Sequence, residues 1–305
     1  MTYLNMKAEN LKCIDFDTLN QLKKLEIINF EDGNMPYFPD KDCNNSAHEE
    51  DTRALDLPNL RMLVLKRIKL LKVPNTSMMP NLENVIISQN AIAEIPGTHF
   101  RHNGKLEGLD IKYNDLTAPP NITGSCSKLS YLGLASNDIT TIPDDYFKGC
   151  SVGNLQLGFN KITSFPNIAP LGNSLSYFNV YNNQIPGMIL DSMMTDFGKL
   201  MELYMAGNKL QGIDVSFCKG NHPIDIHANR NFNLTFFENP YRFCPHLLDT
   251  FATKPRLILT DTQIPCDNHR CWMKKYASKL NIQINDCPDG RKWAALTEAD
   301  VCGQG

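Results

Sequence analysis

Apolar residues recur at a fixed spacing through the middle of this chain. From Leu129 the sequence reads LSYLGLASNDI, so Leu132 and Leu134 follow Leu129 at short intervals and Asn137 comes next. The same arrangement starts again every 23 to 25 residues, at Leu82, Leu106, Val152, Leu175 and Leu200. Within each copy the apolar residues alternate with polar ones, which predicts a short β-strand with one buried face.

A repeat of this length holds one strand and one return segment, so successive strands are expected to stack in parallel as a solenoid. Weaker copies lie at both ends: Leu4 and Met6; Leu22, Leu25 and Ile27 with Phe30; Leu60, Leu63 and Leu65 with Ile68; Ile224 and Ile226 with Asn229; Leu257 and Leu259 with Thr262. The predicted fold class is an α/β solenoid of about 11 short parallel strands, with a concave sheet and an irregular convex side. The consensus resembles that of leucine-rich repeats, which implies a horseshoe over residues 1–262 with insertions at 31–58 and 230–253.

The asparagine after each strand has a predicted structural role. Its amide both donates and accepts hydrogen bonds, so it can satisfy backbone groups where the chain leaves the sheet. Unpaired buried backbone groups are costly, which favours this role over ligand binding. The positions are Asn90, Asn114, Asn137, Asn160, Asn183, Asn208 and Asn229.

Composition and the chain ends narrow the class of protein. The net charge is −3, which gives no general case for nucleic-acid binding. No run of 18 or more apolar residues is present, so no membrane span is expected. The first residues, MTYLNMK, lack a secretion signal and begin almost inside the first strand, so we expect a mature or incompletely represented product.

The ten cysteines indicate an oxidising compartment. Cys126 and Cys150 lie at near-equivalent places just before adjacent strands, so their side chains should be neighbours. A disulfide across that span would contribute about 3 kcal/mol on a loop-entropy estimate. The analogous pairs are Cys13–Cys43 and Cys218–Cys244.

The last segment, residues 263–305, resembles the cysteine-rich C-terminal cap of extracellular leucine-rich-repeat proteins. The matching residues are Cys266, Asp267, Cys271, Trp272 and Met273, with Cys287 and Cys302 as the later pair. The resemblance implies the disulfides Cys266–Cys287 and Cys271–Cys302 and a helix opened by Trp272, which we expect to plug the last repeat. The spacer from Asp267 to Arg270 is longer than the single residue common in the family, which puts the start of that helix in doubt.

The alternative for the four cap cysteines, with His269 nearby, is a zinc site, but only one pair is closely spaced and disulfides are favoured. Residues 172–185 (GNSLSYFNVYNNQI) and 291–302 (RKWAALTEADVC) look most like secreted invertebrate members, especially mollusc-like ones. A looser resemblance is to the non-catalytic subunit associated with crustacean luciferase.

Four Asn-x-Ser/Thr sequons accompany the cysteines, at Asn44, Asn75, Asn121 and Asn233. Beside paired cysteines they support a secreted, N-glycosylated protein. The predicted localisation is therefore extracellular.

The residues between the buried ones face the predicted concave surface, where we place the candidate ligand-binding face. Its members are Tyr131, Asn154, Gln156, Tyr177, Asn179, Tyr181, Glu202, Tyr204, Asp225 and His227. Tyrosine and asparagine are typical of recognition surfaces, because tyrosine offers rigid apolar area with a hydrogen-bonding tip. The alternative is that these tyrosines only stack on one another down the sheet, which also stabilises it.

These features favour a secreted, non-enzymatic protein that binds a protein or glycan-bearing partner in recognition, adhesion or immunity. The alternative is a structural or accessory subunit of an extracellular matrix or multi-protein complex. No catalytic motif is present and the seven histidines are scattered, so neither catalysis nor a cofactor is expected.

Overall fold

The computed structural model describes residues 2–7, 9, 11–41, 43, 53–194, 197–220 and 222–303. The chain divides into two compact units, Met1–Gln156 and Leu157–Gly305. The predicted boundary between solenoid and cap at residues 262 and 263 is a finer division within the second unit and stays a prediction.

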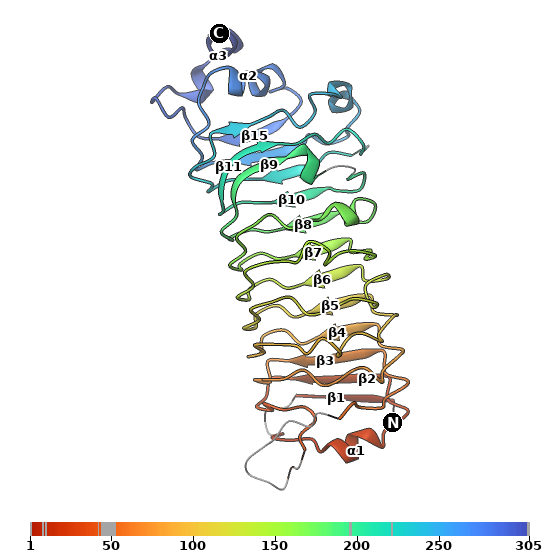
Figure 1. Ribbon diagram of the computed structural model, residues 1–305. Coiled ribbons are helices and arrows are strands. Elements are labelled where there is room, and N and C mark those ends of the chain that lie inside the picture. The colour runs from red at the N-terminus through yellow and green to blue at the C-terminus, as the bar shows by residue number, and fades with distance from the viewer. Residues whose placement is uncertain are drawn as a thin grey trace. The chain divides into compact units, whose positions relative to one another are not determined.

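The first unit is built on a parallel sheet in which the strands follow chain order (Figure 1). Its elements are β1 Tyr3–Lys7, α1 Phe16–Asn20, β2 Ile27–Glu31, β3 Met62–Lys66, β4 Asn84–Ile86, β5 Gly108–Asp110, β6 Tyr131–Gly133 and β7 Asn154–Gln156. In β5 and β6 the central residues Leu109 and Leu132 lie opposite each other and are fully buried. The predicted stacking of one short strand per repeat is confirmed.

The second unit continues the same design and adds an outer sheet. Its main parallel sheet contains β8 Tyr177–Asn179, β10 Glu202–Tyr204, β12 Asp225–His227, β14 Arg256–Leu259 and β15 Asn281–Ile284. The return segments form a parallel three-stranded sheet of β9 Pro186–Leu190, β11 Lys209–Asp214 and β13 Phe236–Phe237. The helices are η1 Ala169–Leu171, η2 Asp191–Met193, η3 Pro245–Asp249, α2 Asn268–Lys275, η4 Trp293–Ala295 and α3 Glu298–Cys302. The outer sheet was not predicted, and neither was β15, a strand contributed by the cap that pairs with β14.

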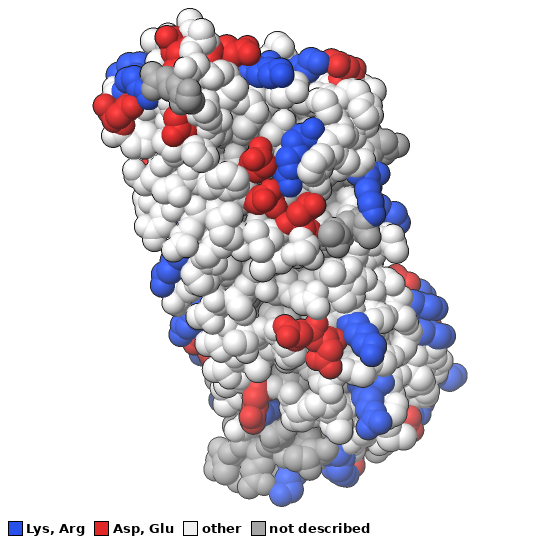
Figure 2. Space-filling view, turned by 45° about the horizontal axis from the view of Figure 1, so that its top comes forward, with Lys and Arg blue, Asp and Glu red and all other residues white. Residues whose placement is uncertain are grey.

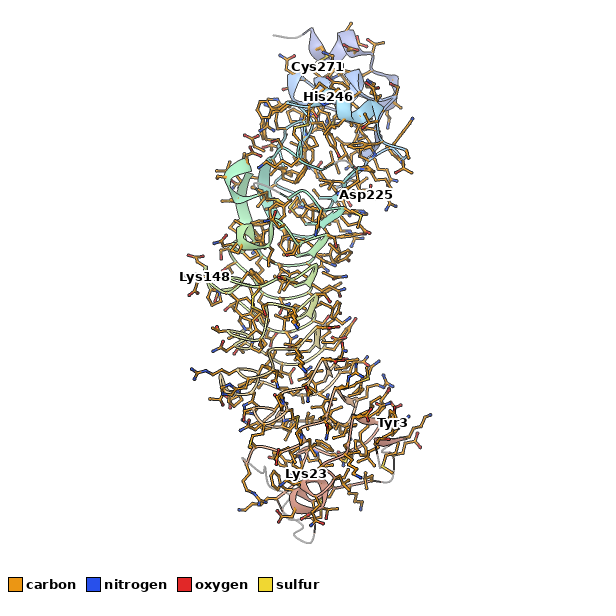
Figure 3. The ribbon with its side chains drawn as sticks, turned by 90° about the vertical axis from the view of Figure 1, so that its right-hand side faces the viewer. Tyr3, Lys23, Lys148, Asp225, His246 and Cys271 are labelled. Atoms are coloured by element: carbon orange, nitrogen blue, oxygen red, sulfur yellow. A yellow bond between two sulfur atoms is a disulfide. The ribbon has the colours of Figure 1, made fainter. Side chains whose placement is uncertain are left out.

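Each main sheet has a buried side and an open face, which carries the residues between the buried ones. Lys148, in the first unit, lies on the side away from the strands, and Asp225, in the second, lies on the strand side (Figure 3). The open face corresponds to the surface predicted as concave.

The asparagines hold adjacent turns together as the sequence predicts. The Asn137 amide donates to the carbonyls of Leu134 and Ile111, both at 3.0 Å, and its oxygen accepts from the Leu116 N–H at 3.0 Å. Asn114 makes the equivalent contacts one repeat earlier. One side chain thus satisfies three backbone groups that the turn leaves without strand partners.

Two repeats begin at positions other than those predicted. In β2 the buried residues are Ile28 and Phe30, because Ile28 lies opposite Leu63 of β3. The assignment of Leu22, Leu25 and Ile27 was therefore three residues early. Ile27 is only half-buried.

In β12 the register identifies a different structural asparagine. Ile226 lies opposite Leu203, so the position matching Asn208 is Asn231, not Asn229. Asn231 is fully buried and donates to the carbonyls of Met205 and Ala228 at 3.1 and 2.8 Å. The prediction for Asn229 was wrong because this repeat lacks the leading leucine that marks the others.

All ten cysteines are paired, and the partners are those named from the sequence. The disulfides are Cys13–Cys43, Cys126–Cys150, Cys218–Cys244, Cys266–Cys287 and Cys271–Cys302. Sulfurs bonded to each other are not available as thiolate ligands, which removes the zinc alternative for the cap.

The cap packs around an unexpected residue. Arg270 of α2 is fully buried, donates to the carbonyl of Ile264 and lies 3.0 Å from that of Asn285. Burial lowers the pKa of Arg270 to about 10. Trp272 is only half-buried and stacks on Phe237 with ring centroids 5.9 Å apart, so it covers the outer sheet. The expectation that Trp272 plugs the last repeat was wrong; Met273 is the fully buried residue beside it.

Candidate functional site

Three rings from neighbouring strands stack on the open face of the second unit, and we call Tyr177, Tyr204 and His227 the aromatic ladder. The ring centroids of Tyr177 and Tyr204 are 5.3 Å apart, and those of Tyr204 and His227 are 4.2 Å apart with planes 26° from parallel. The parallel register places Tyr204 directly opposite His227, whereas Tyr177 lies diagonally, opposite Glu202. Such cross-strand pairs stabilise a sheet by about 0.2–1 kcal/mol each.

The surroundings of Tyr204 and His227 favour the neutral form of each side chain. The Tyr204 hydroxyl donates to Glu202 Oε2 at 2.7 Å. Burial, and then this hydrogen bond, raise the pKa of Tyr204 above its usual value. Burial, and then the nearby charge of Arg256, lower the pKa of His227, whose Nε2 is buried without a hydrogen-bond partner among the described residues.

An ion pair borders the ladder on the side of β14. Arg256 donates its backbone N–H to Asp225 Oδ1 at 2.8 Å, and its Nε and Nη2 lie 2.7 Å from Asp225 Oδ2. This bond raises the pKa of Arg256. Hydrogen bonds between ionised groups are about twice as strong as neutral ones, so the pair fixes both side chains.

Arg256 was missing from the predicted site. Ile226 pairs with Leu257, so Arg256 occupies the same place on β14 as Asp225 on β12 and Glu202 on β10. The signal was present, because Arg256 immediately precedes the predicted buried residue Leu257. Arg256 was not assigned to the site because the repeat that contains it has irregular spacing.

Two other predicted residues of this unit lie beside the ladder. Asn179 donates to the Tyr177 hydroxyl at 3.3 Å and accepts from the Tyr181 N–H at 2.8 Å. Tyr181 lies beyond the end of β8, edge-on to Phe159, and its hydroxyl lies 3.3 Å from Nη1 of Arg230. Asn179 therefore supports the ladder, whereas Tyr181 belongs to a separate contact.

Three predicted residues lie in the first unit. Tyr131 folds over Gly133, and Lys112 Nζ lies 5.6 Å from its ring centroid. Gln156 donates to Asn154 Oδ1 at 3.2 Å. These side chains contact near neighbours in their own unit.

Charge at the surface is arranged in small neutralising groups. On the face that Figure 2 shows, acidic and basic side chains lie next to one another, with broad uncharged areas between the groups. In the first unit Arg67 reaches Glu31 and Asp32 at 3.0 and 2.5 Å. Exposed pairs of this kind contribute little to stability, so this part of the surface is mainly a solvated face.

The sequons differ in exposure. Asn121 and Asn233 are exposed, whereas Asn75 is half-buried, and Asn44 lies outside the described residues. The Asn121 oxygen accepts from the Thr123 N–H at 2.9 Å, so the side chain lies along its own turn. Glycosylation at these positions stays a prediction.

Neither a metal centre nor a bilayer-spanning helix is found in the described part of the chain. Its His, Cys, Asp and Glu residues form no group of three able to hold a metal ion. Among the described helices, none combines the length and apolar character needed to traverse a bilayer.

Comparison with known proteins finds a family model and relatives that resemble parts of this chain. A leucine-rich-repeat family model matches residues 80–139. Fibromodulin from Oryctolagus cuniculus is 29% identical over 157 residues, which cover 51% of this chain and 90% of that sequence. Lumican from Rattus norvegicus is 27% identical over 221 residues, covering 72% of this chain and 59% of lumican.

The fold also has a counterpart among solved structures. The functional domain of InlJ from Listeria monocytogenes, which includes a cysteine ladder, matches with a TM-score of 0.62 at 18% identity. The match covers 94% of this chain and 59% of the InlJ chain. This chain thus spans less than two thirds of lumican and of InlJ, and at this identity the InlJ likeness shows the fold alone.

Proposed function

We propose that this leucine-rich-repeat protein with disulfide-bonded cysteines acts outside the cell as a non-enzymatic binding protein. The partner is a protein, or a glycan-bearing protein, in recognition, adhesion or immunity. The observation that carries the proposal is the aromatic ladder, flanked by Glu202 and the Asp225–Arg256 pair, on the open face of the second unit. Rigid rings beside fixed polar groups are the composition of binding surfaces.

Stacking within the sheet accounts for only part of this arrangement. The ring faces of Tyr204 are used by Tyr177 and His227, which supports the stacking alternative. Stacking does not require a carboxylate beside the Tyr204 hydroxyl or an arginine fixed by three contacts. We therefore assign partner binding to the polar groups beside the ladder, Glu202 and the Asp225–Arg256 pair.

The extracellular setting rests on the cysteines and the relatives. Five disulfides suit an oxidising compartment, and the relatives fibromodulin and lumican are extracellular leucine-rich-repeat proteins. We propose in addition that residues 172–185 and 291–302 mark a secreted, mollusc-like member of this group.

The test is capture of a partner from native fluid by the immobilised protein. Tyr177→Ala and Tyr204→Ala should lose the species that the wild type retains, because each removes rigid contact area at the centre of the surface. Tyr113→Ala is the control, since Tyr113 is 56% exposed and outside the ladder. Circular dichroism and the disulfide map check folding. Undiminished capture by both ladder variants would remove the proposal.

The second candidate function is that of a structural or accessory subunit. It is favoured by strand β1, at the edge of the sheet in the first unit. Met6 of β1 is 42% exposed, whereas Phe30 and Leu65, the matching residues of β2 and β3, are fully buried. An apolar position left open in this way can be covered by another chain. Light scattering on the native protein tests this candidate, which a monomer at all concentrations would refute.

A further inference from the structure

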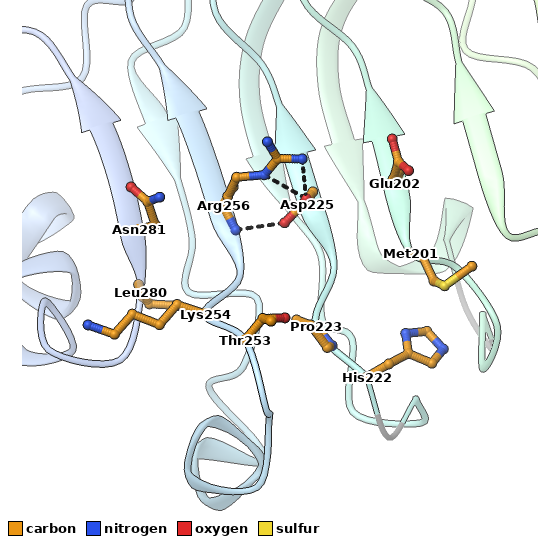
Figure 4. Close-up of a pocket in the computed structure, with 10 residues that line it drawn as sticks. All are labelled: Met201, Glu202, His222, Pro223, Asp225, Thr253, Lys254, Arg256, Leu280 and Asn281. Atoms are coloured by element: carbon orange, nitrogen blue, oxygen red, sulfur yellow. Dashed lines mark hydrogen bonds and ion pairs between the residues drawn. The ribbon is translucent and has the colours of Figure 1, made fainter.

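A pocket of about 690 Å³ lies beside the aromatic ladder, within the second unit (Figure 4). One wall is a row of matching strand positions, Glu202 of β10, Asp225 of β12, Arg256 of β14 and Asn281 of β15. Met201 lies among the apolar residues that complete the lining. The pocket therefore combines charged groups with apolar surface.

Of the two acidic side chains in this row, Glu202 is the one that makes no direct ion pair with a described residue, although the charge of Arg256 acts on it from a distance. Asp225 is neutralised by Arg256, which contacts both of its carboxylate oxygens. Glu202 accepts only the neutral hydroxyl of Tyr204, and no described cation lies within ion-pair distance of it. A carboxylate in a half-buried position gains most from a charge-assisted partner.

The other charges around the pocket leave room for a cation at Glu202. Arg256 is turned towards Asp225, and Lys254 extends away from that pair (Figure 4). The apolar side chains Met201 and Leu280 lie along the pocket, where the methylene stem of an arginine or lysine can pack. An anionic group placed here would instead face the Glu202 carboxylate.

We propose that this pocket receives an arginine or lysine side chain of the protein partner, with Glu202 as its counter-ion. The inference rests on the proposed function, because it names the chemistry that the partner presents at the edge of the ladder. The bound guanidinium or ammonium pairs with Glu202, and the Tyr204 hydroxyl oxygen lies beside it as a further acceptor. The Asp225–Arg256 pair stays intact and fixes the opposite wall.

The experiment is a titration of the whole protein, labelled with ¹³C on its methionine methyl groups, with acetyl-arginine methylamide. Met201 lines the pocket, so its methyl signal reports occupancy. Acetyl-citrulline methylamide has the same shape without the charge, and acetyl-glutamate methylamide carries the opposite charge. We expect the arginine probe to shift the Met201 signal, and the citrulline probe to bind about tenfold more weakly.

Glu202→Gln keeps an acceptor for the Tyr204 hydroxyl but removes the charge, so the arginine response should fall to that of citrulline. Glu298→Gln, at an exposed position in α3 of the same unit, is the matched control and should respond as the wild type does. Equal responses to arginine and citrulline, an unchanged Glu202→Gln titration, or a preference for the glutamate probe would each overturn the inference.

Partner capture separates the two proposals. If Glu202→Gln captures normally while Tyr204→Ala does not, the pocket has no part in binding and the proposed function survives. If neither variant loses capture, the proposed function fails as well. If both variants lose partner capture, and the arginine probe gives the response described above, the result supports both the proposed function and the pocket.

Discussion

Replacing Asn137 with alanine tests whether the repeat asparagines hold the solenoid together. The side chain is 6% exposed and serves three backbone groups, the N–H of Leu116 and the carbonyls of Leu134 and Ile111. Leaving a buried group unsatisfied costs about 1–3 kcal/mol. The variant leaves three such groups without their partner, but water that enters the space left by alanine can pair with some of them. We therefore expect a loss of about 3–5 kcal/mol in the free energy of unfolding.

The assay is guanidinium denaturation followed by circular dichroism, with hydrogen exchange of the Leu116 amide as a local measure. Asn84→Ala is the matched control, since Asn84 is a half-buried asparagine on β4 of the same unit, outside the turn positions. The control should lose less than about 1 kcal/mol, as surface substitutions usually do. If the Asn137 variant were no less stable than the Asn84 variant, or if the Leu116 amide stayed equally protected, the structural role would be refuted.

Three further outcomes are expected. Replacing Cys126 and Cys150 together by alanine should lower the free energy of unfolding by about 3 kcal/mol, because their bond closes a 24-residue span, and an unchanged denaturation midpoint would contradict this. Burial and then the charge of Arg256 hold the pKa of His227 in the folded protein below its value in the unfolded chain. The contribution of His227 to stability is therefore greatest above pH about 6.5 and falls as the pH drops towards the folded pKa. His227→Gln should flatten this dependence in a series of denaturation curves measured between pH 5 and 7. Protein secreted from eukaryotic cells should lose mass on treatment with an N-glycosidase, and Asn233→Gln should remove one glycan, because Asn233 is exposed.

Much of the candidate site could be placed from the sequence. The alternation within each repeat put Tyr177, Tyr204 and His227 on one face, because side chains in a strand point alternately to opposite sides. It could not show that Tyr181 lies apart from them, beside Phe159. That residue follows the end of β8, where the alternation no longer sets the side-chain direction.

The regular core of the fold was determined by the sequence alone. A leucine or asparagine at the same place in successive copies has the same neighbours each time, so Asn114 and Asn137 make matching bonds. The same equivalence brought Cys126 beside Cys150. The local sequence pattern is enough to predict these contacts where each repeat packs only against neighbouring repeats of the same pattern.

Tertiary structure decided what happens where the copies differ. Asn231, not Asn229, became the bonded asparagine because the pairing of β10 with β12 sets the register. Arg256 reaches Asp225, 31 positions earlier, because β14 lies next to β12. In these end repeats the spacing is ambiguous, and the packing of buried side chains against the preceding turn selects one register from several.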